Sequence, residues 1–145
     1  MTSSSSRRIA VTGLGAVTPL GLDLPSTWAA LIEGKNGVGP ISRFDTTKFA
    51  VQIAAEVKGF APEKWIAPKE IKKMGLFIQY AVGAATEALN DAGFTGRFGE
   101  STSSYPNLDP TRVGVCLSAG MGGLPEIQHW DRELASREKK ITSPF

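Results

Sequence analysis

Residues 7–21 of the chain are RRIAVTGLGAVTPLG. The apolar run at 9–11 predicts a buried strand that leads into a glycine turn. Gly13-x-Gly15 after a strand could also open a dinucleotide-binding loop, which needs a small residue at position 18 and a helix directly behind it. Thr18 occupies that position, a proline follows, and no helix signal comes at once. The stretch therefore does not build a phosphate cradle.

The composition is that of one globular domain. The 145 residues are 41% apolar and 21% charged, and no apolar run approaches the length of a membrane helix. The Ser-rich residues 1–8 lack the apolar centre of a signal peptide and predict a disordered lead-in. Cys116 is the one cysteine, which excludes an internal disulfide and favours a reducing, cytoplasmic location. A net charge of +2 predicts neither nucleic acid nor a membrane as partner.

Two buried strands and three helices dominate the predicted secondary structure. The strands are 9–11 and 112–117, with a weaker strand at 51–57. The helices are 25–34, 69–92 and 124–137, the second apolar on nearly all sides and expected to be buried. The composition of residues 95–110 predicts a surface loop that is inserted between the helix 69–92 and the strand 112–117. The fold class is α/β, but two buried strands need more neighbours than these elements supply, which indicates an incomplete N-terminal portion of a larger domain.

Three side chains and one lysine patch invite a chemical interpretation. Cys116 lies inside an apolar strand and is predicted to be a buried hydrophobe rather than a nucleophile. His129 has no convergent partners, so a structural histidine is favoured over a base, and neither metal nor cofactor is expected. Met121, between glycines after a strand, suits either an apolar cavity wall or ordinary core packing.

Lysines gather at the predicted start of the helix 69–92. Lys69, Lys72 and Lys73 lie where the helix dipole disfavours positive charge by about 0.3–1 kcal/mol per residue. A sequence that tolerates this cost is either presenting cations to an anionic partner or has a solvated helix end. Lys139 and Lys140 could extend the same patch.

Several segments, taken in order, resemble the N-terminal part of β-ketoacyl-acyl-carrier-protein synthases, and most closely the type II condensing enzyme of bacterial fatty acid synthesis. They cover the chain from about Arg7 to Phe145. The segments are VTGLGAVTPLG, STWAALIEGKNGV, RFDTTKF, PKEIKKMGLFIQYAVGAATEALNDAG, RVGVCLSAGMGGL and ITSPF. Family members are about three times longer than this chain.

The resemblance implies a thiolase-like fold of two similar halves, paired as a homodimer, with the strands 9–11 and 113–117 in one sheet. It implies a decarboxylative Claisen condensation of an acyl chain with malonyl-acyl carrier protein. A cysteine at a helix N-terminus would take the acyl chain and two histidines would support decarboxylation. All three match positions beyond this chain, so the chain alone is expected to be inactive, and Cys116 and His129 match none of them.

The residues that the resemblance does assign are supporting ones. Met121 and Phe145 match positions of the acyl pocket. The lysines match two basic clusters that contact the acidic, phosphopantetheine-bearing carrier protein, namely Lys69, Lys72, Lys73, Lys139 and Lys140. Three alternatives stay open. The first is a chain-length-factor partner without the nucleophile, and the second is a ketosynthase of polyketide synthesis. The third is a self-contained short α/β domain without a ligand.

Overall fold

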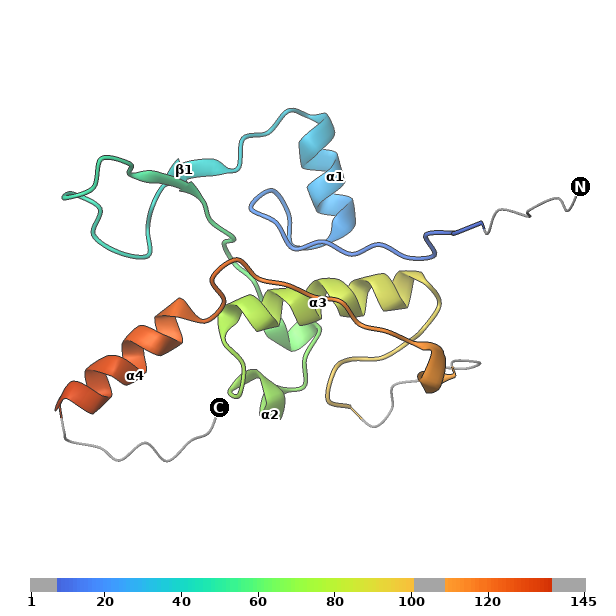
Figure 1. Cartoon of the computed structure of the whole chain (residues 1–145). Helices are drawn as coiled ribbons and strands as arrows, with labels where there is room; N and C mark the ends of the chain where they lie inside the picture. Colours follow the sequence, from blue (N-terminus) through green and yellow to red (C-terminus); the bar gives the residue numbers. More distant parts are fainter. Residues whose placement is uncertain (1–7, 101–108, 137–145) are drawn as a thin grey trace, which may run out of the picture.

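The computed structural model describes residues 8–100 and 109–136 of the chain (Figure 1). No helix among these residues is both long and apolar enough to cross a membrane. The elements, in order, are α1 (Leu24–Ile32), β1 (Val38–Pro40), β2 (Ile53–Ala55), η1 (Pro62–Lys64), α2 (Pro68–Ile71), α3 (Leu76–Asp91), η2 (Pro110–Arg112) and α4 (Leu124–Ser136).

Helix α1 follows from local signals and lies within two residues of its predicted range. The carboxylate of Asp23 accepts a hydrogen bond from Ser26 N at 2.9 Å, which satisfies one of the free N–H groups of the first turn. Pro25 occupies the first turn, where its missing N–H costs nothing. Gly34 follows the helix with φ +68°, a conformation that glycine adopts without strain.

The sheet of the described residues is a two-stranded antiparallel pair. β2 confirms the middle of the predicted strand 51–57, and it pairs with β1 in the register Val38↔Ala55 and Pro40↔Ile53. β1 lies in a stretch that the sequence indicates as a Gly-rich connector. Its conformation depends on a partner about 15 residues away, a relation that local patterns do not carry.

The predicted single helix over 69–92 is wrong, because it is broken into α2 and α3. Gly75 is the N-cap of α3 in extended conformation, with ψ 157°. The side-chain amide of Gln79 donates to the carbonyl of Met74 at 2.8 Å, and so satisfies a group that the break leaves open. The break also takes Lys72 and Lys73 out of the first two turns of a long helix, whereas Lys69 stays in the first turn of α2. α2 is a single turn with Lys72 at its C-cap, where positive charge is favourable.

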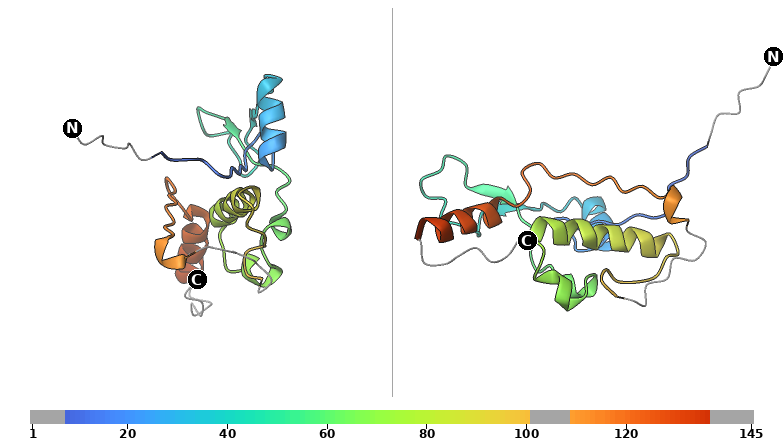
Figure 2. Two further views of the ribbon diagram at one scale, coloured as in Figure 1. Left: turned by 90° about the vertical axis from the view of Figure 1, so that its right-hand side faces the viewer. Right: turned by 60° about the horizontal axis from the view of Figure 1, so that its bottom comes forward.

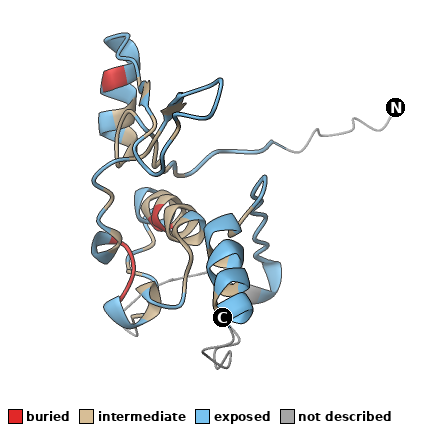
Figure 3. Ribbon diagram, turned by 90° about the vertical axis from the view of Figure 1, so that its left-hand side faces the viewer, coloured by how far each residue is buried: buried red, intermediate tan, exposed pale blue. Residues whose placement is uncertain are grey.

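The best-packed part of the molecule lies between η1 and α2, against α3 (Figure 3). Trp65, Ile66 and Ala67 are buried there, and Ile66 has no exposed surface. On α3, Gly83 and Thr86 are buried. A Cβ at Gly83 would lie 3.3 Å from the Trp65 ring, closer than ordinary packing allows, so this glycine lets Trp65 approach the helix. The rest of α3 is half-buried or, at Phe77 and residues 89–91, exposed, which is less burial than its apolar sequence predicts.

Two extended stretches, residues 9–17 and 113–121, run alongside α3 (Figure 2). The first is pressed onto the helix backbone. A Cβ at Gly13 would lie 2.1 Å from Ala88 O, and one at Gly15 would lie 2.1 Å from Ala84 O. Both glycines are therefore required by close packing, which explains the motif that resembles the start of a nucleotide loop.

Both stretches run in the same direction, opposite to α3. Along the first, Gly13 lies near Ala88 and Gly15 lies near Ala84, so the stretch moves toward the start of the helix. Along the second, Leu117 borders a hollow with residues 82–94, whereas Gly122 lies near Phe77. Two parallel segments with an antiparallel helix on one face have the arrangement of a βαβ unit.

Neither stretch is a strand in the described structure, and the prediction that both are buried is wrong. Ile9 is 95% exposed and Val115 is 83% exposed. The physical reason is that an apolar strand is buried by neighbours on its edges and cover on both faces. Within residues 8–100 and 109–136, each stretch has α3 on one side and lacks a hydrogen-bonded strand on either edge.

Candidate functional site

The lysine cluster of α2, defined here as Lys69, Lys72 and Lys73, is exposed to solvent. Lys73 pairs with Glu70, its Nζ lying 3.0 Å from the carboxylate. Lys69 and Lys72 form no ion pair with any residue that the structure describes. A single turn therefore presents three ammonium groups with one carboxylate beside them, an arrangement that attracts an acidic surface.

This turn is attached to the molecule at its N-terminal side, by the buried residues 65–67. The backbone N–H of Ala67 donates to Phe98 O at 2.8 Å, and Phe98 N donates to Trp65 O at 3.0 Å. Lys64, just before, lies 4.4 Å from the centre of the Trp65 ring and 3.4 Å from the carboxylate of Asp23. The cluster therefore directly follows the most buried segment of the described chain.

Met121 lies on the turn between the second extended stretch and α4. It is 77% exposed, and the next residue, Gly122, has φ +61°; a Cβ at Gly122 would lie 3.7 Å from the Phe77 ring. A hollow of about 280 Å³ lies nearby, between α3 and residues 117–119. Its walls are mainly apolar, since Phe77, Ile78 and Val82 contribute to it. The role of Met121 in an acyl pocket stays a prediction, and Phe145 lies outside the described residues.

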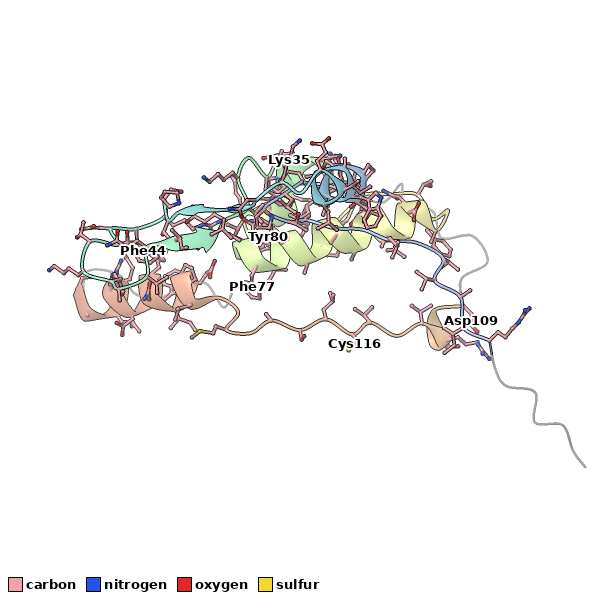
Figure 4. All side chains as sticks on the ribbon, turned by 90° about the horizontal axis from the view of Figure 1, so that it is seen from above. Lys35, Phe44, Phe77, Tyr80, Asp109 and Cys116 are labelled. Atoms are coloured by element: carbon pink, nitrogen blue, oxygen red, sulfur yellow. The ribbon has the colours of Figure 1, made fainter. Side chains whose placement is uncertain are left out.

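The other predicted residues divide between exposed positions and undescribed ones. The prediction that Cys116 is buried is wrong, because it is exposed on the second extended stretch, with its side chain directed away from α3 (Figure 4). His129 is exposed on α4, with its ring centre 5.0 Å from that of Trp130, and its structural role stays a prediction. Lys139 and Lys140 lie outside the described residues. No three potential metal ligands converge within the described ranges.

Sequence reasoning missed two carboxylates on α3 that hold the N-terminal stretch. Glu87 accepts from Ala16 N at 2.8 Å through one oxygen and from Leu24 N at 2.9 Å through the other. Asp91, one turn later, accepts from Leu14 N at 2.9 Å. Four residues of helix and two residues of extended chain have the same length, about 6–7 Å. Carboxylates four residues apart on α3 can therefore accept from backbone N–H groups two residues apart on the stretch. Acidic residues four apart in an otherwise apolar helix are the signal that could have found them.

Three carboxylates elsewhere have lowered pKa values because nearby groups donate hydrogen bonds to them. Hydrogen bonds from Ser26, with smaller help from Lys64, hold the pKa of Asp23 below its ordinary value. The hydroxyl of Ser42 does the same for the pKa of Glu56, and the two join the ends of the β1–β2 hairpin. The pKa of Asp45 is lowered by the backbone N–H and hydroxyl of Thr47. None of these groups faces the lysine cluster or Met121, so they stabilise loops rather than catalyse.

A larger hollow, of about 790 Å³, separates the loop after β1 from α4. Phe44 and Phe49 form one wall, their ring centres 5.6 Å apart, and Arg43 and Arg132 add positive charge. The guanidinium of Arg43 donates to the hydroxyl of Tyr80 at 3.0 Å, which ties this loop to α3.

Comparison with known proteins assigns the chain to a protein family. The family model described as "Beta-ketoacyl synthase, N-terminal domain" matches residues 6–144. Proteins named 3-oxoacyl-[acyl-carrier-protein] synthase 2 match nearly the whole chain, with 42% identity over 140 residues in Coxiella burnetii and 38% over 141 residues in Vibrio cholerae. The chain spans 31% and 32% of these relatives' length.

Among solved structures, one titled "The ishigamide ketosynthase/chain length factor" aligns with a TM-score of 0.54 and 41% sequence identity. The alignment covers 59% of this chain and 21% of that one. Sequence and fold thus agree on the family predicted from the ordered motifs, and the chain belongs to the β-ketoacyl synthases, whose N-terminal domain it matches.

Proposed function

We propose that the protein of which this chain is a part condenses an acyl chain with malonyl-acyl carrier protein in fatty acid elongation. The observation that carries this proposal is 42% identity, over 96% of the chain, to a 3-oxoacyl-[acyl-carrier-protein] synthase 2. The βαβ arrangement of residues 9–17, α3 and 113–121 supports it. Such a unit suits one half of a thiolase-like fold, in which both stretches become neighbouring parallel strands.

In this proposal the described chain supplies scaffold and recognition, not the reacting groups. The nucleophilic cysteine and both histidines are assigned to positions outside these 145 residues, because neither Cys116 nor His129 matches the catalytic motifs. The test is a malonyl-dependent elongation assay on the purified 145-residue chain and on the complete reading frame that contains it. We expect activity from the second only. Elongation by the 145 residues alone would refute the assignment.

The partner proposed for the lysine cluster is an acyl carrier protein, an acidic protein that bears its acyl chain on phosphopantetheine. Exposed lysines that face an acidic surface raise the association rate and are screened by salt. Charge reversal at Lys72 and Lys73 is expected to weaken carrier-protein binding by roughly ten- to a hundredfold at low ionic strength, and less at high salt. The matched control is reversal at Lys35 and Lys48, which changes the net charge equally and lies elsewhere. Equal affinity of both double variants would contradict the proposal.

Met121 and Phe145 are proposed to line the acyl pocket, and the active form is proposed to be a cytoplasmic homodimer. The glycines on both sides of Met121 support its part, since they leave that side chain room to move. Substitution of Met121 by tryptophan should shift the enzyme toward shorter acyl substrates, measured as relative kcat/KM over a series of chain lengths. A uniform loss at all lengths would argue against a pocket position.

The alternative function is that of a non-catalytic chain-length factor or a polyketide ketosynthase. The observation behind it is the structural similarity, at 41% identity, to the ishigamide ketosynthase/chain length factor. The residue at the nucleophile position of the complete reading frame separates the first of these from an enzyme. Product analysis with acyl- and malonyl-carrier protein separates a single condensation, which yields a 3-oxoacyl chain, from the repeated condensations that form a polyketide.

A further inference from the structure

We infer that residues 97–99 form a brace that sets the orientation of α2, so that Arg97 and Gly99 are positioning residues for the lysine cluster. The inference rests on the proposed carrier-protein docking and adds a device that controls it. α2 has four residues and cannot hold itself, since a single turn gains too little from its own hydrogen bonds. What holds it must therefore come from its neighbours.

The backbone of Phe98 is the first part of the brace. Its N–H donates to Trp65 O at 3.0 Å and its carbonyl accepts from Ala67 N at 2.8 Å, which makes a parallel bridge around Ile66. Ile66 is fully buried, and Ala67 is the N-cap residue of α2. The bridge therefore fixes the chain at the point where α2 begins, and a rotation of α2 would break one of these two hydrogen bonds.

The side chain of Arg97 is the second part. One Nη donates to the carbonyl of Glu63 in η1 at 2.7 Å, and Nε donates to the carboxylate of Glu100 at 2.8 Å. The guanidinium group thus links residues 97–100 to η1, which precedes the buried residues 65–67. Two donors in a fixed plane restrain direction as well as distance, which a lysine at this position would not do.

Gly99 is the third part, and it acts on Lys73 through Glu70. Its φ is +84°, and a Cβ there would lie 2.6 Å from Cγ of Glu70 and 3.3 Å from Cβ of Ala67. Glu70 in turn pairs with Lys73 at 3.0 Å. A side chain at position 99 would displace Glu70 and release Lys73, without removing any charge from the surface.

Orientation matters because the docking site is one short turn. Binding is weakened when flexible groups must be ordered on contact, and preorganised groups avoid that cost. A brace that keeps the cations in one arrangement therefore raises affinity without contact to the partner. It also makes a distinct prediction: variants that keep every charge should still weaken docking.

The experiment uses the complete enzyme and two charge-neutral changes, Gly99→Ala and Arg97→Lys. The control is Gly34→Ala, which also replaces a glycine of positive φ (+68°) but has open space around the new Cβ and lies at the end of α1. Steady-state kinetics are measured with malonyl- and acyl-carrier protein, and in parallel with acyl and malonyl thioesters of free pantetheine. Thermal melts report folding.

Both brace variants should raise KM for the carrier-borne substrates roughly three- to tenfold at unchanged kcat, with the free thioesters turned over as by the wild type. The control variant should match the wild type in all kinetic readouts, and its melting temperature should fall slightly because alanine at a positive φ is strained. Unchanged KM in both variants overturns the brace. Equal losses with free thioesters overturn it too, because a general structural defect would then be the cause. If charge reversal at Lys72 and Lys73 leaves docking intact, the docking proposal itself fails, whatever the brace variants do.

Discussion

Removal of the Glu87 carboxylate should detach the N-terminal stretch from α3 and from the start of α1. The two oxygens accept from Ala16 N at 2.8 Å and from Leu24 N at 2.9 Å, in a half-buried place. A hydrogen bond to a charged group contributes about 1.5–3 kcal/mol, and partial exposure favours the lower end. Glu87→Ala should therefore cost about 3 kcal/mol. Glu87→Gln should cost about half of that, since one acceptor oxygen remains.

The assay is amide hydrogen exchange, read at Ala16 and Leu24, together with urea unfolding. A loss of about 3 kcal/mol should lower the protection of these two amides by about a hundredfold. The matched control is Glu33→Gln. It breaks the Glu33–Lys35 pair, whose side chains are 58% and 63% exposed, and should cost less than about 1 kcal/mol. Wild-type protection at both amides in Glu87→Ala would refute the clamp.

Two further predictions concern stability. Asp23→Ala should destabilise the protein by about 1 kcal/mol at pH 7, whereas Asp23→Asn, still a good N-cap, should cost less. The folded-state pKa of Asp23 is lowered, so its contribution to stability is present above the unfolded pKa and is lost as the pH falls through the folded pKa. The urea midpoints of wild type and Asp23→Ala should therefore converge in acid. A difference between the midpoints that persists in acid would contradict this. Ile66→Ala should cost about 2–4 kcal/mol and Ile66→Val about 1 kcal/mol, because Ile66 is fully buried; equal midpoints for the two variants would count against the packing argument.

Much of the local structure could be predicted because its causes are local. α1 lies between a capping aspartate and a left-handed glycine, and α3 ends before Gly93, which has φ +88°. α4 begins at Leu124, the residue at which its start is predicted. In each case the hydrogen bonds close within four residues, so the sequence around the end contains the necessary information.

The break between α2 and α3 is where local patterns failed. Helical periodicity continues through residues 69–92, and Gly75 alone does not specify a break. The structure places the buried residues 65–67 and the bridge to Phe98 directly before α2, and these contacts set its direction independently of α3. The presentation of the lysine cluster is therefore a tertiary property, although its composition is visible in the sequence.

The stretch at 7–21 shows the same division. Its residue types determined by themselves that no phosphate loop forms, because Thr18 and a proline stand where a small residue and a helix are needed. In order with the later motifs, they also determined the family. Only the tertiary structure decided what Gly13 and Gly15 are for, namely contact with the α3 backbone, and which carboxylates hold the stretch there. Burial of an apolar strand was likewise decided by neighbours, since hydrogen bonding across a sheet joins residues far apart in the chain.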